Sequence, residues 1–120
     1  DLFIELQVKP HAIFSRKGEN LLLTIPVTFA EAALGADIKV PTLSGDDVTV
    51  RLAPGTPTGR VLRVKGRGIK KGAITGDLLI TIEVQVPRRA EGKAEEAIKA
   101  FAAATSDDDV RAEFNAKAKQ

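Results

Sequence analysis

The feature of this sequence that most constrains its fold is a strand-like segment that occurs twice. Residues 1–10 read DLFIELQVKP, and residues 76–87 read GDLLITIEVQVP. Aligned without gaps, with Asp1 opposite Asp77, the two segments share aspartate, leucine, isoleucine and valine at matching places. Apolar residues at every second position are typical of a strand that buries one face. The sequence therefore predicts the same strand at its beginning and again after residue 76.

Short strands separated by glycine- and proline-rich turns are predicted between these two segments. Hairpins are expected over residues 13–16 with 21–27 and over 36–43 with 48–52, and a further strand over 60–65. Thr28 and Glu31 have the spacing of a capping box, so a helix of little more than one turn should follow Thr28 and end at Gly35. The segment GRGIKKGAITG, residues 66–76, is predicted to be a mobile basic loop.

The pattern changes to helical spacing after Pro87. Ala94, Ala97, Ile98 and Phe101 recur at the spacing of one helix face, which predicts an amphipathic helix over about residues 91–104. The rest is polar, with at most a weak further turn. The predicted fold class is mainly β: a small β-sandwich, or a partly open barrel, with one very short helix and then a C-terminal amphipathic helix.

Composition limits the class of protein. A length of 120 residues suits a single core. There is no cysteine, which excludes disulfides and thiolate chemistry and fits a reducing compartment. No apolar run reaches the ~20 residues that a membrane span requires, and no export signal is evident at the N-terminus. We therefore expect a cytoplasmic protein that does not enter a membrane.

Nucleic-acid binding is disfavoured by the charge and by the aromatic content. The pI is about 9.1, but 18 basic residues against 16 acidic ones leave a net charge of only +2. A protein that binds a phosphate backbone usually concentrates more positive charge on one face. The aromatic residues are five phenylalanines, with no Trp or Tyr, so few side chains could stack on bases.

No residue pattern indicates catalysis, a metal or a cofactor. His11 is the only histidine and follows a proline at a strand end, so a structural or surface role is expected for it. The aspartates at 46–47 and 107–109 lack the alternating spacing of a calcium loop. The glycines of residues 66–72 precede a strand and not a helix, which does not fit a dinucleotide fingerprint. Weak anion contact by Lys65, Arg67, Lys70 and Lys71 stays open. We therefore expect a binding protein and not an enzyme.

Five motifs in one order resemble the C-terminal region of the DnaJ family, the co-chaperones of DnaK. They are HxxFxRxGxNL from His11, EAALG from Glu31, VPTLxG from Val40, PGT from Pro54 and GDL from Gly76. The resemblance runs from about residue 1 to residue 102. The signature of the J-domain and the Cys-x-x-Cys pairs of a zinc module are both absent from this sequence, so functions of those parts are not implied for it.

The resemblance implies a division of the chain into four parts. Residues 1–10 are the closing strand of a preceding β-domain with its linker, and residues 11–88 are the second C-terminal β-domain. Residues 89–104 form a dimerisation helix, and residues 105–120 are a polar tail. The repeated strand is then a trace of two related domains in tandem. The implied partners are unfolded polypeptide clients, a second copy of the chain in a weak homodimer, and a DnaK-type chaperone through other parts of a full protein.

Site residues follow from this resemblance together with the strand pattern. Phe3 and Leu79 are apolar residues on the otherwise polar faces of the two repeated strands, and they are the candidates for client contact. The candidate dimerisation residues are Ala94, Ala97, Ile98 and Phe101, although the helix could instead pack on its own β-domain. Two other functions stay open: a structural spacer that dimerises without binding clients, and a basic nucleic-acid-binding β-barrel.

Overall fold

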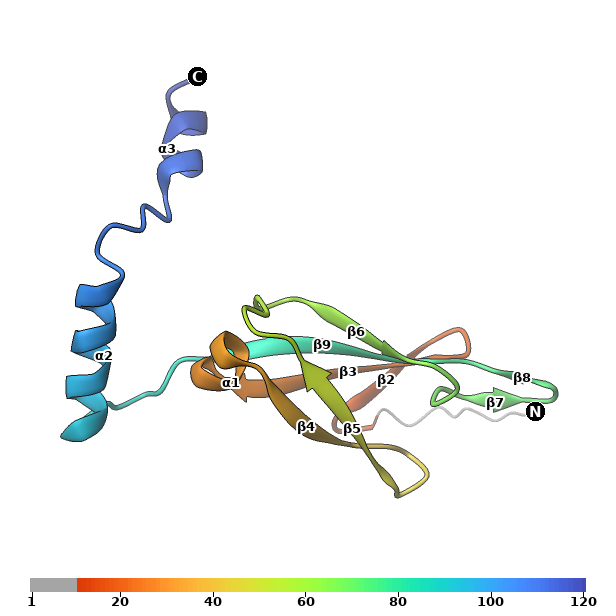
Figure 1. Ribbon diagram of the computed structural model, residues 1–120. Helices are drawn as coiled ribbons and strands as arrows, with labels where there is room; N and C mark the ends of the chain where they lie inside the picture. The colour runs from red at the N-terminus through yellow and green to blue at the C-terminus, as the bar shows by residue number, and fades with distance from the viewer. Residues whose placement is uncertain (1–10) are drawn as a thin grey trace. The chain divides into compact units, whose positions relative to one another are not determined.

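The computed structural model describes residues 11–120, and it divides into two compact units, one ending at Val86 and the other comprising Pro87–Gln120 (Figure 1). Residues 1–10, which include the first copy of the repeated strand, lie outside the described residues. The elements in order are β2 (Phe14–Lys17), β3 (Asn20–Thr28), α1 (Phe29–Leu34), β4 (Ala36–Pro41), β5 (Asp47–Leu52), β6 (Val61–Val64), β7 (Lys70–Lys71), β8 (Ile74–Thr75), β9 (Leu78–Gln85), α2 (Lys93–Ala104) and α3 (Ala112–Ala118).

A four-stranded sheet in the order β2-β3-β9-β6 forms the larger layer of the first unit. β2 with β3 and β6 with β9 are antiparallel pairs, whereas β3 and β9 run parallel in the centre. The second copy of the repeated strand, β9, is therefore a central strand. Leu78, Ile80 and Ile82 of β9 are all buried, with more exposed residues between them, because successive side chains point to opposite faces and only one face is in the core.

The parallel register puts matching residues of β3 and β9 on the same face. Leu21 lies opposite Leu78 and Leu23 opposite Ile80, and all four are buried in the core. We call this the inner face of the sheet. The intervening residues, such as Thr24 and Thr81, form the outer face, which is more exposed.

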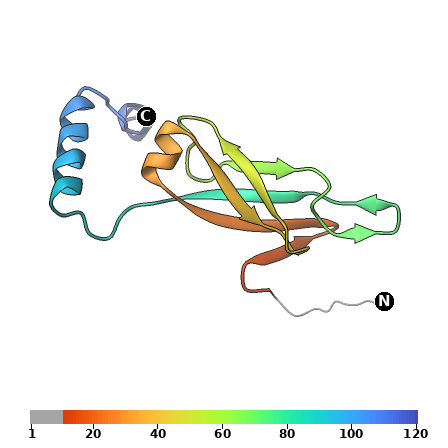
Figure 2. The ribbon, with the colours of Figure 1, turned by 60° about the horizontal axis from the view of Figure 1, so that its bottom comes forward.

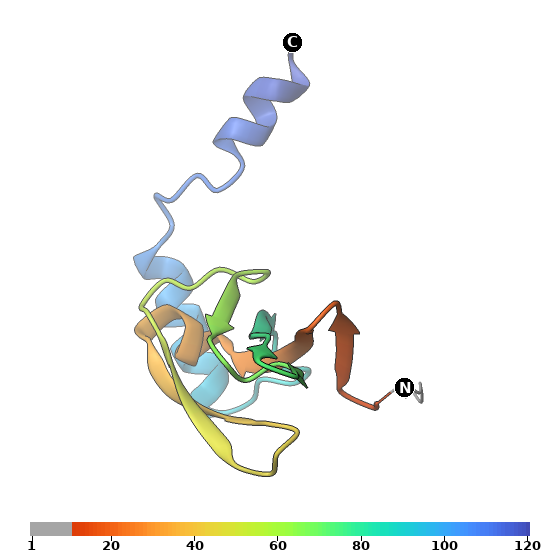
Figure 3. The ribbon, with the colours of Figure 1, turned by 90° about the vertical axis from the view of Figure 1, so that its right-hand side faces the viewer.

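The second layer consists of the β4–β5 hairpin and the short helix α1, which cover the inner face. Val40 and Leu52 of the hairpin are 1% exposed and belong to the same core cluster as the inner-face residues. The hairpin runs obliquely to the long strands β3 and β9 (Figures 1 and 2) and lies on one side of the sheet when it is viewed end-on (Figure 3). The predicted β-sandwich with one very short helix is confirmed.

Local contacts explain why α1 begins and ends where the sequence predicts. The Thr28 hydroxyl accepts a hydrogen bond from the Glu31 amide at 3.0 Å, and the Glu31 carboxylate accepts one from the Thr28 amide at 2.9 Å. This is the expected capping box. Gly35 follows with φ +86°, and a Cβ there would lie 2.9 Å from the Leu52 carbonyl oxygen, so only glycine fits this crossing.

The segment 66–76 forms a short hairpin, β7–β8, where the sequence predicted a loop without strands, and its mobility stays a prediction. The Ile69 amide donates to the Glu19 carbonyl at 2.8 Å, and the Gly76 amide donates to the Ile69 carbonyl at 3.0 Å. The first bond fastens the base of the hairpin to the β2–β3 turn, and the second joins the two ends of the hairpin segment. Glycine at position 76 permits the close approach to the turn, because a Cβ there would overlap the Glu19 carbonyl group.

The second unit contains α2 and α3. α2 begins at Lys93, two residues after the predicted start, and ends at Ala104 as predicted. α3 is a helix of seven residues in the part where the sequence suggests a polar tail with at most a weak turn. Among residues 11–120, no helix has both the length and the apolar character needed to cross a bilayer.

Candidate functional site

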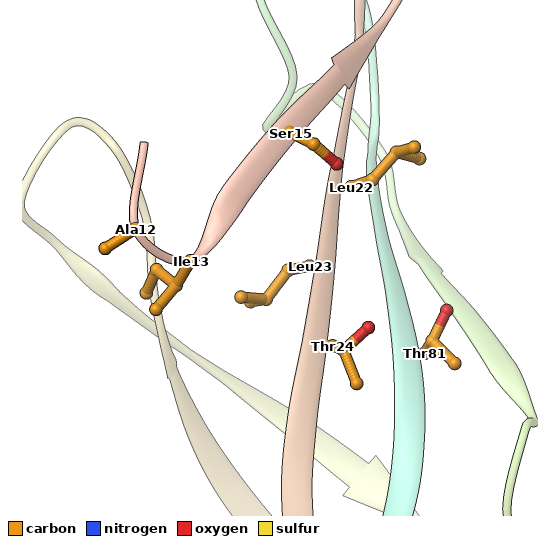
Figure 4. A pocket seen from close by; sticks show the side chains of 7 residues that line it. All are labelled: Ala12, Ile13, Ser15, Leu22, Leu23, Thr24 and Thr81. Carbon is orange, nitrogen blue, oxygen red and sulfur yellow. The ribbon is translucent and has the colours of Figure 1, made fainter. Parts of the chain in front are cut away.

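A shallow pocket on the outer face of the four-stranded sheet is the first candidate for a binding site. Its volume is about 410 Å³. Residues from β3, β9 and the start of β2 surround it (Figure 4). They are Ala12, Ile13, Ser15, Leu22, Thr24 and Thr81, together with Leu23, whose side chain belongs to the core on the inner face. Aliphatic side chains and hydroxyl groups therefore line the pocket, and none of its lining residues carries a charge.

The strand registers bring these side chains together. Ser15 of β2 lies opposite Leu22 of β3, and Thr24 of β3 lies opposite Thr81 of β9. Opposed residues of neighbouring strands point to the same face, so Ser15 and Leu22 stand beside Thr24 and Thr81. Ile13 precedes β2 and is 50% exposed at one side of the pocket.

β2 is an edge strand, and His11 fixes the backbone at its start. The Nδ1 atom of His11 accepts hydrogen bonds from the amides of Ile13, at 3.1 Å, and Phe14, at 3.4 Å. The imidazole ring also makes an edge-to-face contact with the Phe14 ring, with the centroids 5.1 Å apart. His11 thus has the structural role that the sequence suggested, and it positions the wall of the pocket that Ile13 forms.

Of the two residues predicted to contact clients, the structure describes only Leu79. Leu79 lies on the outer face, half-buried, opposite Leu22 of β3 and Arg63 of β6. It stands on the same face as the pocket but is not one of the residues that line it. Phe3 lies outside the described residues. The prediction of client contact by either residue stays a prediction.

Asp77 joins three strands at the end of the sheet next to β7–β8. Its carboxylate accepts hydrogen bonds from the Gly66 amide, at 3.0 Å, and from the Arg63 guanidinium, and these contacts lower the pKa of Asp77 below its usual value of 3.8. Its amide donates to the Asn20 side-chain oxygen at 2.8 Å. The charge of Asp77 is therefore used to hold strand ends together, which is a structural use and not a catalytic one.

The predicted dimerisation stripe is placed on α2. Ala94, Ala97, Ile98 and Phe101 are all exposed, and the two large side chains are 48% and 49% exposed, respectively. Their positions at i, i+3, i+4 and i+7 put them on one helix face. Glu95 and Lys99 form an ion pair at 3.3 Å, also on α2.

Most pocket residues were not predicted from the sequence, although one signal was available for Leu22. The run Leu21-Leu22-Leu23 breaks the alternation of its strand, so one leucine must lie on the outer face. The same reasoning had selected Leu79. The hydroxyl residues Ser15, Thr24 and Thr81 gave no such signal, because polar residues are ordinary on an outer face. Within residues 11–120, no group of three or more His, Asp or Glu residues could hold a metal ion.

Comparison with known proteins gives one family and many relatives. The family model described as DnaJ C terminal domain matches residues 1–87. Chaperone protein DnaJ 1 of Streptomyces avermitilis is 52% identical over 120 residues, which cover 99% of this chain and 30% of that protein. Chaperone protein DnaJ 1 of Streptomyces coelicolor is 50% identical with the same coverage. Chaperone protein DnaJ 2 of Mycolicibacterium paratuberculosis is 50% identical over 105 residues, 87% of this chain and 26% of that protein. The chain thus spans less than a third of the length of these relatives.

Proposed function

The chain belongs to the DnaJ C-terminal domain family, and from that premise we propose that it is the client-binding and dimerising part of a DnaJ-type co-chaperone. Residues 11–88 are the β-domain that contacts unfolded polypeptide, and residues 89–104 are the helix that pairs two copies. The chain performs no catalysis and acts in the cytoplasm. Assistance to a DnaK-type chaperone would run through parts of such a protein that this chain does not span.

The observation that carries the client-binding proposal is the position of the uncharged pocket beside an edge strand. An extended peptide can add a strand to an exposed sheet edge, where main-chain hydrogen bonds supply affinity that does not depend on sequence. The outer edge of β2 pairs with no other strand among residues 11–120. Every second side chain of an added peptide would face the outer side of the sheet, where the pocket opens next to β2.

The pocket chemistry fits an aliphatic side chain of an unfolded client. Ile13 and Leu22 offer apolar surface, and the methyl groups of Thr24 and Thr81 extend it. The hydroxyl groups remain able to bond water or peptide groups. A pocket of this kind selects apolar residues loosely, which suits a protein that must accept many sequences.

A peptide-binding measurement with one pocket variant and one matched control tests this proposal. Ile13 is 50% exposed beside the pocket, and Leu34 is 75% exposed on α1, which covers the inner face of the sheet. If a bound side chain covers the exposed half of Ile13, Ile13→Ser loses about 1 kcal/mol, which weakens a labelled extended apolar peptide about fivefold. Leu34→Ser should bind like the parent, and Leu79→Ser shows whether client contact extends along the outer face.

The same titration separates client binding from the spacer function. Equal affinities of parent and Ile13→Ser, both with the circular dichroism of a folded protein, would remove the pocket from the proposal. No measurable binding by any of the proteins, together with retained dimers, would identify the chain as a spacer. Fluorescence anisotropy of the peptide supplies the affinity, and sedimentation of the same samples supplies the mass.

The dimerisation proposal depends on the exposed stripe of α2. Ile98 and Phe101 are about half exposed, so association can remove about half of each from water. At about 1.5–3 kcal/mol for a fully buried side chain, these two residues in both copies gain about 3–6 kcal/mol. The freedom lost on association offsets much of this gain, so α2 alone supports only a weak dimer. Even a weak dimer is useful, because it makes a second grip on the same client intramolecular.

Sedimentation of two aspartate variants tests the role of α2. Phe101→Asp places a charge in the stripe, whereas Phe114→Asp makes the same change in α3, where Phe114 is 68% exposed. The parent and Phe114→Asp should show mass that increases with concentration, and Phe101→Asp should remain monomeric. The same mass for Phe101→Asp and the parent at every concentration contradicts the proposed interface.

A further inference from the structure

A second pocket lies between the turn that follows β4 and the hairpin β7–β8. Its volume is about 340 Å³. The lining residues are Thr42, Leu43, Ser44, Gly66, Arg67, Gly68, Lys70 and Thr75. It shares no residue with the pocket on the outer face of the sheet, and neither the family match nor the relatives' names assign a role to it.

The charge of this pocket is entirely positive. Arg67 and Lys70 are among the lining residues, and no carboxylate is. Within residues 11–120, neither of them forms an ion pair, although other arginines do, such as Arg51 with Asp37. Two cations that face one cavity without a carboxylate partner repel each other slightly, and an anion placed between them relieves that repulsion.

The backbone on both sides of Arg67 is held by hydrogen bonds. The Gly66 amide donates to the Asp77 carboxylate at 3.0 Å, and the Gly68 amide donates to the Gly76 carbonyl at 2.9 Å. A Cβ on Gly68 would lie 2.5 Å from backbone atoms of Gly76 and Asp77, so any larger residue would push this segment away. The backbone at Arg67 is therefore held in place before a ligand arrives, so binding costs entropy chiefly in the Arg67 side chain.

The opposite wall combines fixed polar groups with one exposed apolar side chain. Thr42 is 8% exposed, its hydroxyl donates to the Asp46 carbonyl, and the Ser44 hydroxyl lies 2.9 Å from it. Leu43 stands between these residues in the chain and is 52% exposed. A ligand in this pocket thus meets two cations on one side and an aliphatic surface on the other.

We propose that this pocket binds an acidic stretch of extended polypeptide. A glutamate or aspartate carboxylate would accept hydrogen bonds from Arg67 and Lys70, and a neighbouring apolar side chain would lie against Leu43. Nucleic acid fits less well, because no aromatic residue lines the pocket for stacking. The carboxylates of Asp46, in the adjoining turn, and Asp47, at the start of β5, also repel nucleic acid, which has a phosphate at every nucleotide, more than a peptide whose acidic residues are separated by apolar ones.

The test compares two labelled peptides that differ only in charge, one with alternating Glu and Leu and one with Gln in place of each Glu. Two charge-assisted hydrogen bonds should make the Glu peptide bind the parent about tenfold more tightly than the Gln peptide. The double variant Arg67→Gln, Lys70→Gln should lose this preference. The control Lys39→Gln, Arg60→Gln has the same net charge, changes no residue that lines the pocket, and should keep the preference.

Three results would overturn the proposal. The first is equal affinity of the parent for the two peptides. The second is an equal loss of the preference for the Glu peptide in the pocket variant and in the control, which would indicate only attraction between net charges. The third is tighter binding of a single-stranded DNA oligonucleotide than of the Glu peptide, with loss of DNA binding in the pocket variant, which indicates a nucleic-acid site. The affinity of the apolar peptide used for the outer-face pocket should be the same in the parent and in both double variants.

Discussion

His11 stabilises the start of β2 in two ways, and two substitutions can separate them. Its Nδ1 atom accepts hydrogen bonds from the amides of Ile13 and Phe14, and its ring contacts the Phe14 ring edge-on. His11→Phe keeps a ring and removes the acceptor. His11→Ala removes both. The difference between the two variants therefore reports the contribution of the ring contact.

The geometry sets the expected magnitudes. The bond from the Ile13 amide, at 3.1 Å, should contribute about 1 kcal/mol, and the bond from the Phe14 amide, at 3.4 Å and close to the limit of hydrogen-bond length, should contribute less. The aromatic contact adds about 0.5–1.5 kcal/mol. We expect the free energy of unfolding to fall by about 1 kcal/mol in His11→Phe and by about 2 kcal/mol in His11→Ala.

Urea unfolding followed by far-ultraviolet circular dichroism measures these changes, because the chain has no Trp or Tyr to report by fluorescence. Amide hydrogen exchange gives the local readout: the Ile13 and Phe14 amides should exchange faster in both variants than in the parent. A His11→Phe variant with the stability of the parent and equally slow exchange at these two amides refutes the acceptor role of Nδ1.

Three further predictions concern the core and the strand ends. Gly76→Ala would drive a Cβ into the backbone of Glu19, so we expect the free energy of unfolding to fall by about 3 kcal/mol or more and the melting temperature to drop. A melting temperature like that of the parent would contradict this contact. Ile80→Val, at a residue with 0% exposure, should lower the free energy of unfolding by about 0.5–1.5 kcal/mol in urea, and no loss would mean that the Ile80 side chain is not packed in the core. The pKa of Asp77 is lowered in the folded state, chiefly by the Gly66 amide, so its stabilising contribution is present above pH 3.8 and disappears as the pH falls further. Acid titration of unfolding should therefore show a steeper loss below that pH in the parent than in Asp77→Asn, and identical profiles would exclude this linkage.

Features that depend on neighbours in the chain could be predicted from the sequence. The capping box of Thr28 and Glu31, the two hairpins before residue 53 and the alternation of β9 all rest on spacings of two to four residues. α2 also agrees with its apolar repeat. In each case the residues that determine the element lie within it or next to it, so tertiary packing had little to change.

Features that depend on distant pairing could not be predicted in this way. β3 and β9 are 57 positions apart and lie parallel, and no local pattern distinguishes that pairing from an antiparallel one. This register decides that Thr24 and Thr81 meet at the outer-face pocket. The placement of the hairpin in segment 66–76 likewise depends on the hydrogen bond from the Ile69 amide to Glu19, far back in the chain. The contact role of Phe3 stays a prediction, since that residue lies outside the described part.

The central position of β9 has a consequence for the way the protein is made. β9 is the last strand of its sheet in the chain, yet both β3 and β6 hydrogen-bond to it. While the chain is being synthesised, β2, β3 and the β4–β5 hairpin leave the ribosome before the strand that joins them to β6. Until β9 also emerges, the leucines of β3 have no neighbour on that side and are exposed to aggregation. The domain that we propose to bind unfolded polypeptides would thus itself expose apolar residues of the kind such domains bind until its synthesis is complete.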